Sequence, residues 1–219
     1  MRTVVFDLDG TLADTSADLL AAANVCFRGL GHGDLLGPDD ALTAFHGARA
    51  MLRLGFSRLG PVDEALIDAQ YPVFIDAYGQ AINVHTRLYP GVVEAVETLR
   101  RNGFAVSICT NKPEGLAEEL CLRLGIRGLF AALIGADTLP TRKPDAAPYV
   151  AAVQQAGGSV ARSMLIGDTE TDRRTGLAAG VPVALVTFGP EGRAVERLQP
   201  EALLDHFDEL PELAQRLLG

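Results

Sequence analysis

The sequence has little that would suit a secreted, membrane-spanning or nucleic-acid-binding protein. Its only cysteines, Cys26, Cys109 and Cys121, are scattered and in no metal-ligand spacing, so we expect reduced thiols in a cytoplasm. No run of about 18 apolar residues occurs, and the chain leads directly into a strand-like segment without a signal-peptide pattern. The formal net charge of -9 argues against attraction to nucleic acid or to an anionic membrane surface. We therefore expect a cytoplasmic protein with neither nucleic-acid nor membrane partners.

The composition is that of a folded protein with a substantial core. Hydrophobic residues make up 48% of the chain, which is too many for a disordered segment. A length of 219 residues suits one large domain or one domain that carries a smaller insertion. No histidine lies near any cysteine in the sequence, which argues against a thiol nucleophile.

Short apolar segments alternate with helix-like segments in most of the chain. We expect strands at 3–8, 104–110, 132–136, 163–168 and 182–187, and helices at 91–102, 113–124, 146–157 and 171–179. This alternation predicts an α/β fold, a Rossmann-like parallel sheet core covered by helices on both faces.

The region between the first two predicted strands contains only helix-like runs, at 16–30, 39–54 and 62–82. We therefore expect an all-helical cap domain over 15–85, inserted into a core domain made of 1–14 and 86–219. Residues near 14–17 and 84–88 are then expected to form two hinge strands.

Every predicted strand that carries a motif ends in polar residues. The first ends in DLDGT, the second in CTNKP and the fourth in GDTETD, while TRKPDAAP lies between the third and the fourth. Ligands of open parallel sheets bind at the carboxyl ends of the strands. We expect the functional site there.

Four acids are expected at this edge. Asp7 and Asp9 lie two residues apart, so they point to the same side if the strand continues, and Gly10 then allows a sharp turn. Asp168 and Asp172 are about one helical turn apart. Converging carboxylates repel one another unless a cation intervenes, and Mg²⁺ is the hard ion that prefers oxygen ligands.

The remaining polar groups favour phosphoryl transfer. Lys143 supplies a fixed positive charge, and Thr110 and Asn111 supply neutral donors for phosphate oxygens. A carboxylate can attack phosphorus while a second carboxyl group handles the proton of the leaving oxygen. Each of these residues also has a structural alternative, because Asp, Thr and Asn are favoured in turns and helix caps.

The segments DLDGTLADT, TNKP, RKP and GDTETD resemble, in order and separation, the four motifs of the haloacid dehalogenase-like superfamily of phosphatases. The position of the helical insert resembles the subfamily with a helical cap after the first motif, and TNKP with YPGVVEAVETLRRNG is similar to phosphoglycolate phosphatases. The resemblance implies Mg²⁺ as cofactor, a small phosphorylated metabolite, most favourably 2-phosphoglycolate, as substrate, and a monomer or homodimer. It implies catalytic roles for Asp7 as nucleophile, Asp9 as general acid and base, and Lys143, and substrate binding by Gly10, Thr11, Thr110 and Asn111. It implies metal binding by Asp7, the backbone carbonyl of Asp9 and Asp168, with Asp172 either a further ligand or a residue that positions the ligands.

Two further features each have two interpretations. Arg49, in the cap segment HGAR, is a candidate for binding a substrate carboxylate, with a solvated helix face as the alternative. Arg173 and Arg174 directly follow Asp172, and pairing with either one would remove Asp172 from a metal. An ordinary surface ion pair is the alternative.

The same residues are compatible with other activities. A phosphomutase of the β-phosphoglucomutase type would use the same acids and return the phosphoryl group to a second hydroxyl. A phosphatase for another small phosphorylated metabolite is a further alternative. A dehalogenase is disfavoured by Asp9, and a receiver-type signalling module would need no helical insert of this length.

Overall fold

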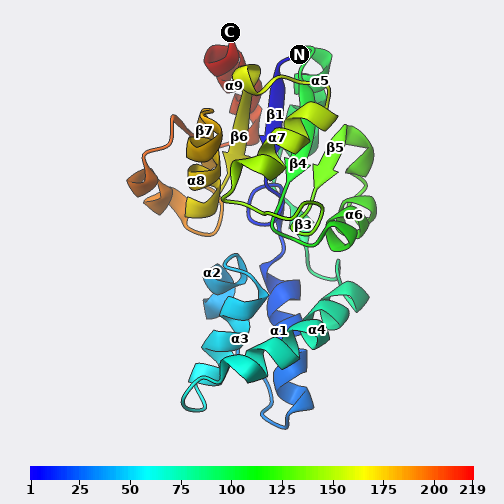
Figure 1. Cartoon of the computed structure of the whole chain (residues 1–219), viewed down its shortest axis with the longest axis vertical. Coiled ribbons are helices and arrows are strands. Elements are labelled where there is room, and N and C mark those ends of the chain that lie inside the picture. Colours follow the sequence, from blue (N-terminus) through cyan, green and yellow to red (C-terminus); the bar gives the residue numbers. More distant parts are fainter. The chain divides into compact units, whose positions relative to one another are not determined.

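A six-stranded parallel sheet forms the centre of the larger of two units in the computed structural model, which describes residues 1–219 (Figure 1). This unit comprises Met1–Ala13 and Leu88–Gly219. The strand order is β5-β4-β1-β6-β7-β8. The strands are β1 Thr3–Phe6, β4 Ala105–Cys109, β5 Ala132–Ile134, β6 Ser163–Gly167, β7 Val183–Val186 and β8 Ala202–Leu204.

Helices cover both faces of the sheet, as the alternating pattern predicts. On one face, α7 (Ala146–Gln155) and α8 (Glu170–Ala179) pack against the strands and against each other. On the other face lie α5 (Val92–Arg101) and α9 (Leu210–Leu218), while α6 (Glu114–Arg123) packs against β5. The α/β expectation is confirmed. Short 3₁₀ segments occupy Pro38–Asp40, Arg127–Leu129, Val160–Arg162, Gly192–Leu198 and Phe207–Glu209.

The register of the three central strands aligns their carboxyl ends. Phe6 of β1 lies opposite Ile108 of β4 and Ile166 of β6. The next residue, Asp7, is therefore level with the last residues of both neighbouring strands. All four β1 residues are buried, because a strand at the middle of a covered sheet has no solvent face.

The smaller unit, Asp14–Arg87, is helical. It contains α1 (Ser16–Gly29), α2 (Ala41–Ala44), α3 (Ala48–Ser57) and α4 (Glu64–Gln80). Phe27 and Phe56 meet edge to face with ring centroids 5.1 Å apart, joining α1 to α3. The division differs from the expected cap bounds by one or two residues, and its interpretation as a separate domain stays a prediction.

The middle helical run differs from expectation. A single run over 39–54 is wrong, because the chain breaks between α2 and α3. Gly47 there has a φ of +90°, a backbone conformation that residues with a side chain rarely adopt. The expected hinge strands are also shorter: β2 is Ala13–Asp14 and β3 is Arg87–Leu88, and the two pair with each other.

Asp18 of α1 holds the segment that precedes β3. Its buried carboxylate accepts hydrogen bonds from the backbone N–H groups of Val84, His85 and Thr86 at 2.9–3.0 Å, and from the Thr86 hydroxyl at 2.8 Å. A carboxylate with this many donors replaces its lost hydration. The residues expected as a strand at 84–86 are instead a side-chain-bonded linker.

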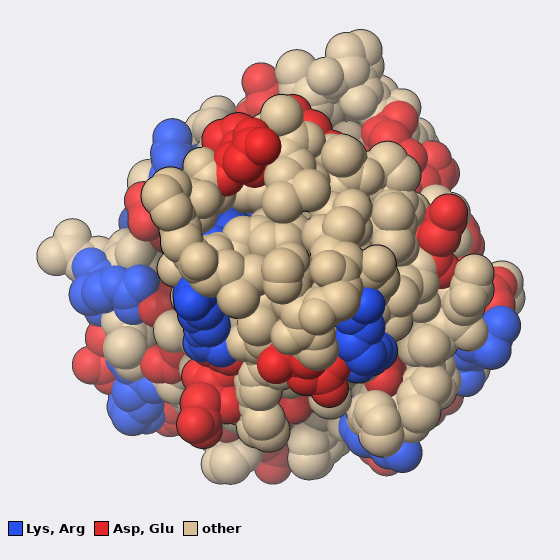
Figure 2. Space-filling view, turned by 90° about the horizontal axis from the view of Figure 1, so that it is seen from below, with Lys and Arg blue, Asp and Glu red and all other residues tan.

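No helix has the length and apolar character needed to cross a bilayer. On the face shown in Figure 2, positive side chains are interspersed with acidic ones and form no continuous basic patch. The cytoplasmic location stays a prediction.

Candidate active site

The predicted site residues converge where the three central strands end. Asp7 follows β1, Thr110 follows β4 and Asp168 follows β6. The chain passes from β1 outward to β4 and β5 and then returns to β6 on the other side of β1, so the strand order reverses at this point. Ligands of open parallel sheets bind where the strand order reverses, which is why polar groups were expected at this edge.

Lys143 joins two of the acids. Its Nζ lies 3.0 Å from Asp7 Oδ2 and 2.6 Å from Asp172 Oδ1, and its side chain is 1% exposed. Burial by itself would lower the pKa of Lys143, but the carboxylates of Asp172 and Asp7 outweigh it and raise that pKa above its usual range. Lys143 therefore carries a permanent charge between Asp7 and Asp172.

Asp7 and Asp168 are carboxyl groups whose pKa values are raised by their surroundings. Burial raises the pKa of Asp7 to about 6; Lys143 opposes the rise, and Asp172 and Asp9 add to it. Burial is the largest cause that raises the pKa of Asp168 well above its usual value, and the charges of Asp172 and Asp7 add to it. The Thr11 hydroxyl donates to Asp168 Oδ1 at 2.9 Å, whereas Asp168 Oδ2 is buried and has no hydrogen-bond partner. Such a group is costly without a compensating cation.

Asp172 is fixed from several sides at the start of α8. Its Oδ2 accepts from the Thr169 N–H at 3.1 Å, the Thr169 hydroxyl at 2.8 Å and the Asp168 N–H at 3.2 Å. The carboxylate packs on Gly167, where an added Cβ would lie 2.3 Å from Asp172 Cγ. Only glycine at position 167 leaves room for this arrangement.

Asp172 forms no hydrogen bond or ion pair with Arg173 or Arg174. Arg173 instead binds Glu201, with Nη1 2.8 Å from Oε2, and donates to the Leu198 carbonyl at 3.2 Å. Successive residues of a helix are about 100° apart, so Asp172 faces the site while Arg173 faces away. The concern that an arginine withdraws Asp172 is removed.

Lys112 is a charged site residue that the sequence analysis did not single out. Its Nζ lies 3.0 Å from Asp9 Oδ2, and its side chain is 4% exposed against 19% for Asp9. Its position next to Thr110 and Asn111 in TNKP was the available signal.

The expected phosphate-binding residues line the same loops. Thr110 is buried, donates its N–H to Ile134 O at 2.9 Å and accepts at Oγ1 from the Lys112 N–H at 3.2 Å. Asn111 Nδ2 donates to the Lys143 carbonyl at 3.0 Å, which joins this loop to the next. Gly10 has a φ of +81°, as its turn role predicts. The substrate contacts of Gly10, Thr11, Thr110 and Asn111 stay predictions.

The acids form a group that could hold a metal ion. Each of Asp7, Asp168 and Asp172 offers an oxygen, and these atoms all lie within 4.8 Å of one another. The unpartnered Asp168 oxygen is the observation that favours a cation, because it is buried and no protein group donates a hydrogen bond to it. An all-oxygen donor set suits Mg²⁺.

Arg49 lies in the helical unit and is engaged there. Its guanidinium forms an ion pair with Asp68 and lies over the Tyr71 ring, 4.6 Å from the centroid. Its side chain is about half exposed. Its proposed contact with a substrate carboxylate stays a prediction, and that contact would replace the Asp68 partner.

None of the three thiols has the character of a nucleophile. Cys26, Cys109 and Cys121 are buried and unpaired, and burial raises their pKa to about 11, 12 and 12. Thiols with such high pKa values are poor nucleophiles.

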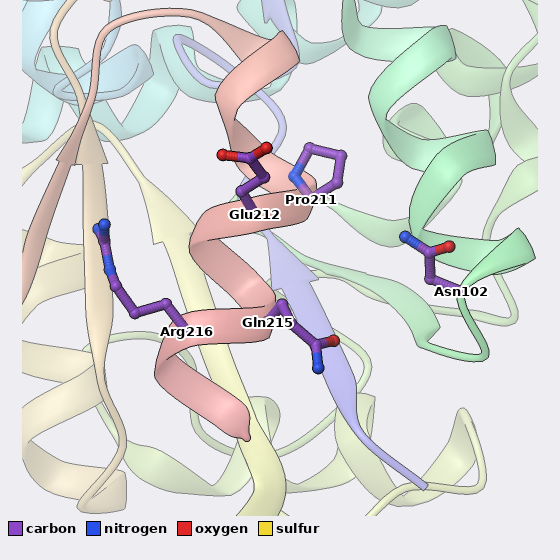
Figure 3. A pocket seen from close by; sticks show the side chains of 5 residues that line it. All are labelled: Asn102, Pro211, Glu212, Gln215 and Arg216. Carbon is purple, nitrogen blue, oxygen red and sulfur yellow. The ribbon is translucent and has the colours of Figure 1, made fainter.

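A depression of about 590 Å³ lies at the other end of the sheet (Figure 3). It is lined by Asn102 after α5 and by four residues of α9, Pro211, Glu212, Gln215 and Arg216. Gln215 binds Arg2 at 2.7 Å, and Arg2 precedes β1, whereas Asp7 follows it. None of the candidate site residues lines this depression.

The fold and the site define an enzyme with acidic groups at the switch point of a parallel sheet. The chain belongs to the haloacid dehalogenase-like hydrolases, whose family model matches residues 1–180. It is 40% identical to the phosphoglycolate phosphatase of Mesorhizobium japonicum over 98% of this chain and 96% of that protein. It is 37% identical to the phosphoglycolate phosphatase of Agrobacterium fabrum, over 98% and 93%. A crystal structure described as a predicted phosphoglycolate phosphatase from Haemophilus somnus matches with a TM-score of 0.84 and 24% identity, over 98% of each chain.

Proposed function

We propose that this chain is a Mg²⁺-dependent phosphomonoester hydrolase that works through an aspartyl-phosphate on Asp7, with 2-phosphoglycolate as its substrate. The observation that carries the proposal is the setting of Asp7: a buried carboxylate 3.0 Å from the Lys143 ammonium and grouped with the unpartnered Asp168 oxygen. The names of relatives 37–40% identical over nearly the whole chain support the substrate.

In the first half of the reaction, an Asp7 oxygen forms a bond to phosphorus while the bond from phosphorus to the ester oxygen breaks. Asp9 donates its proton to that leaving oxygen, which departs as the alcohol group of glycolate. Lys143 holds the Asp7 carboxylate in place and offsets negative charge that builds on the phosphoryl oxygens.

In the second half, water attacks the phosphorus of the aspartyl-phosphate and gives a proton to Asp9. The bond between Asp7 and phosphorus breaks, inorganic phosphate leaves, and both carboxyl groups return to their starting states. When bound, Mg²⁺ supplies positive charge for the phosphoryl oxygens.

We assign Asp7, the Asp9 carbonyl and Asp168 as the residues that would hold the ion. Asp172 orients the site from outside, because its oxygens already accept bonds from Lys143, Thr169 and the Asp168 N–H.

The helical unit is proposed to be a cap that contributes to substrate choice through Arg49. A guanidinium binds a carboxylate with paired, charge-assisted hydrogen bonds, and 2-phosphoglycolate carries a carboxylate beside its phosphate ester.

The test is phosphate release from a panel of small phosphomonoesters, with Mg²⁺ and with EDTA. We expect 2-phosphoglycolate to have the highest kcat/KM and EDTA to abolish turnover. Asp7→Asn should remove activity while the protein stays folded. Isomerised sugar phosphate without net phosphate release would instead identify a phosphomutase, and substantial activity of Asp7→Asn would refute the nucleophile.

A further inference from the structure

Lysine is nearly absent from this chain, and both of its lysines are at the site. Of the 19 lysines and arginines, only Lys112 and Lys143 are lysines. Both side chains are almost fully buried, and each ammonium group lies against a site aspartate. Lysine provides a compact point charge, whereas arginine carries a wider planar group. The second of these lysines has a role in the proposed reaction, and the first does not yet have one.

The backbone of Lys112 is fixed on both sides. Its N–H donates to Thr110 Oγ1 at 3.2 Å, and its carbonyl accepts from the Ala136 N–H at 2.9 Å, which ties it to the loop after β5. Pro113 follows and precedes α6. The ammonium group therefore projects from a rigid base at the end of β4.

The contact with Asp9 is tight and shielded from water. Nζ and Oδ2 are 3.0 Å apart, and the lysine side chain is 4% exposed. A buried ammonium is expensive without an acidic partner, so Lys112 and Asp9 constrain each other. A fixed partner restricts the directions in which the Asp9 carboxyl group can point.

We propose that Lys112 is a positioning residue for Asp9: it holds that carboxyl group in the orientation from which the proton reaches the leaving oxygen. The inference rests on the proposed phosphatase function. A proton donor works only within hydrogen-bond reach of its target, so loss of orientation costs the rate even though Asp9 itself is present.

A positioning role and a purely structural role differ in how the loss of kcat/KM depends on the leaving group of the ester. An alkoxide such as that of glycolate is a poor leaving group and needs the proton, while p-nitrophenolate leaves readily without it. We expect Lys112→Met to lower kcat/KM for 2-phosphoglycolate about 100-fold, within the usual range of general acid catalysis, and for p-nitrophenyl phosphate less than about 10-fold. Asp9→Asn should show the same inequality.

The experiment compares Lys112→Met, Asp9→Asn and the double variant on both esters with saturating Mg²⁺. If Lys112 acts through Asp9, Lys112→Met adds less than about 3-fold to the loss already caused by Asp9→Asn. Lys112→Arg keeps the charge and should recover part of the alkyl-ester rate relative to Lys112→Met. Arg173→Met is the matched control, because it removes a partly buried cation from an ion pair outside the site. It should change neither rate.

Equal losses on the two esters, or independent losses in the double variant, would overturn the positioning role. If Lys112→Met does not fold, the ratio of the two rates in folded Lys112→Arg decides: an unchanged ratio at reduced activity overturns the proposal. Failure of the function itself is seen separately, because the unaltered protein would then release phosphate from neither ester.

Discussion

Lys143 Nζ lies between Asp7 and Asp172, 3.0 Å from an oxygen of the first and 2.6 Å from an oxygen of the second. One cation thus connects the residue that follows β1 with the first turn of α8. The position of the proposed nucleophile consequently depends on an element far away in the sequence.

Replacing Lys143 by methionine leaves two buried carboxylates without their shared cation. We expect the free energy of unfolding to fall by about 3–5 kcal/mol, the usual result of removing one member of a buried pair. Because Lys143 lowers the pKa of Asp7, that pKa should rise above its value of about 6. Chemical denaturation and the acid limb of the rate profile measure the two effects. A variant with unchanged stability would contradict the buried pair.

The pH dependence of the metal-free protein reports on Asp7. Its pKa is raised from 3.8 to about 6 on folding, so the folded state binds the proton more tightly than the unfolded state. The resulting stabilisation is complete below pH 3.8 and is lost as the pH rises through about 6, an amount of about 3 kcal/mol for this shift. Asp7→Asn should show a smaller loss between pH 4 and about 7 in denaturant titrations with EDTA. Parallel curves for both proteins would rule the effect out.

Magnesium binding should raise the melting temperature through Asp168. At about 100 times its Kd a ligand adds about 2.7 kcal/mol, which corresponds to about 5–10 °C for a chain of this size. Asp168→Asn should lose this rise. It should also melt higher than the unaltered protein in EDTA, because it removes an unpartnered buried carboxylate. Calorimetry with and without Mg²⁺ gives both results, and an equal Mg²⁺ response in the variant would exclude Asp168 as a ligand.

Asp18 should be a main determinant of order in the linker that precedes β3. Asp18→Ala leaves the N–H groups of Val84, His85 and Thr86 without their buried acceptor, which we expect to cost about 2–3 kcal/mol. Hydrogen exchange of these amides should accelerate. The matched control is Asp63→Ala, which removes a single cap bond to the Ala65 N–H and should cost about 1 kcal/mol. Similar exchange at 84–86 in both variants would disprove the linker role.

The role of Arg49 can be tested by the chemistry of the substrate. Arg49→Ala should raise KM for 2-phosphoglycolate by about 10-fold or more, because a charge-assisted pair is lost, and should change KM for p-nitrophenyl phosphate little. Asp68→Ala frees Arg49 from its present partner and serves as the control, with an unchanged or lower KM for the carboxylate ester. Equal effects of Arg49→Ala on both esters would remove it from recognition.

The sequence was sufficient to predict the sheet and the edge that carries the site. Apolar runs that end in polar residues identify buried parallel strands, and the topology of such sheets brings their carboxyl ends together. It did not reveal β8 or α9, where the hydrophobic signal is short, nor the break at Gly47. The sequence also did not show which charged side chains form ion pairs with each other. Arg173 is adjacent to Asp172 in sequence yet binds Glu201, while Lys112 binds Asp9 from more than 100 residues away.

The burial of both lysines also has a practical consequence. The side chain of Lys143 is 1% exposed and that of Lys112 is 4% exposed, and a carboxylate binds each ammonium group. Acylating reagents that attack amines therefore cannot reach them in the native protein. Covalent labelling of Lys112 and Lys143, followed by peptide mass spectrometry, would therefore count the molecules in which these loops have opened. Each lysine reports on its own loop, which makes the pair a built-in probe of local opening in the catalytic unit.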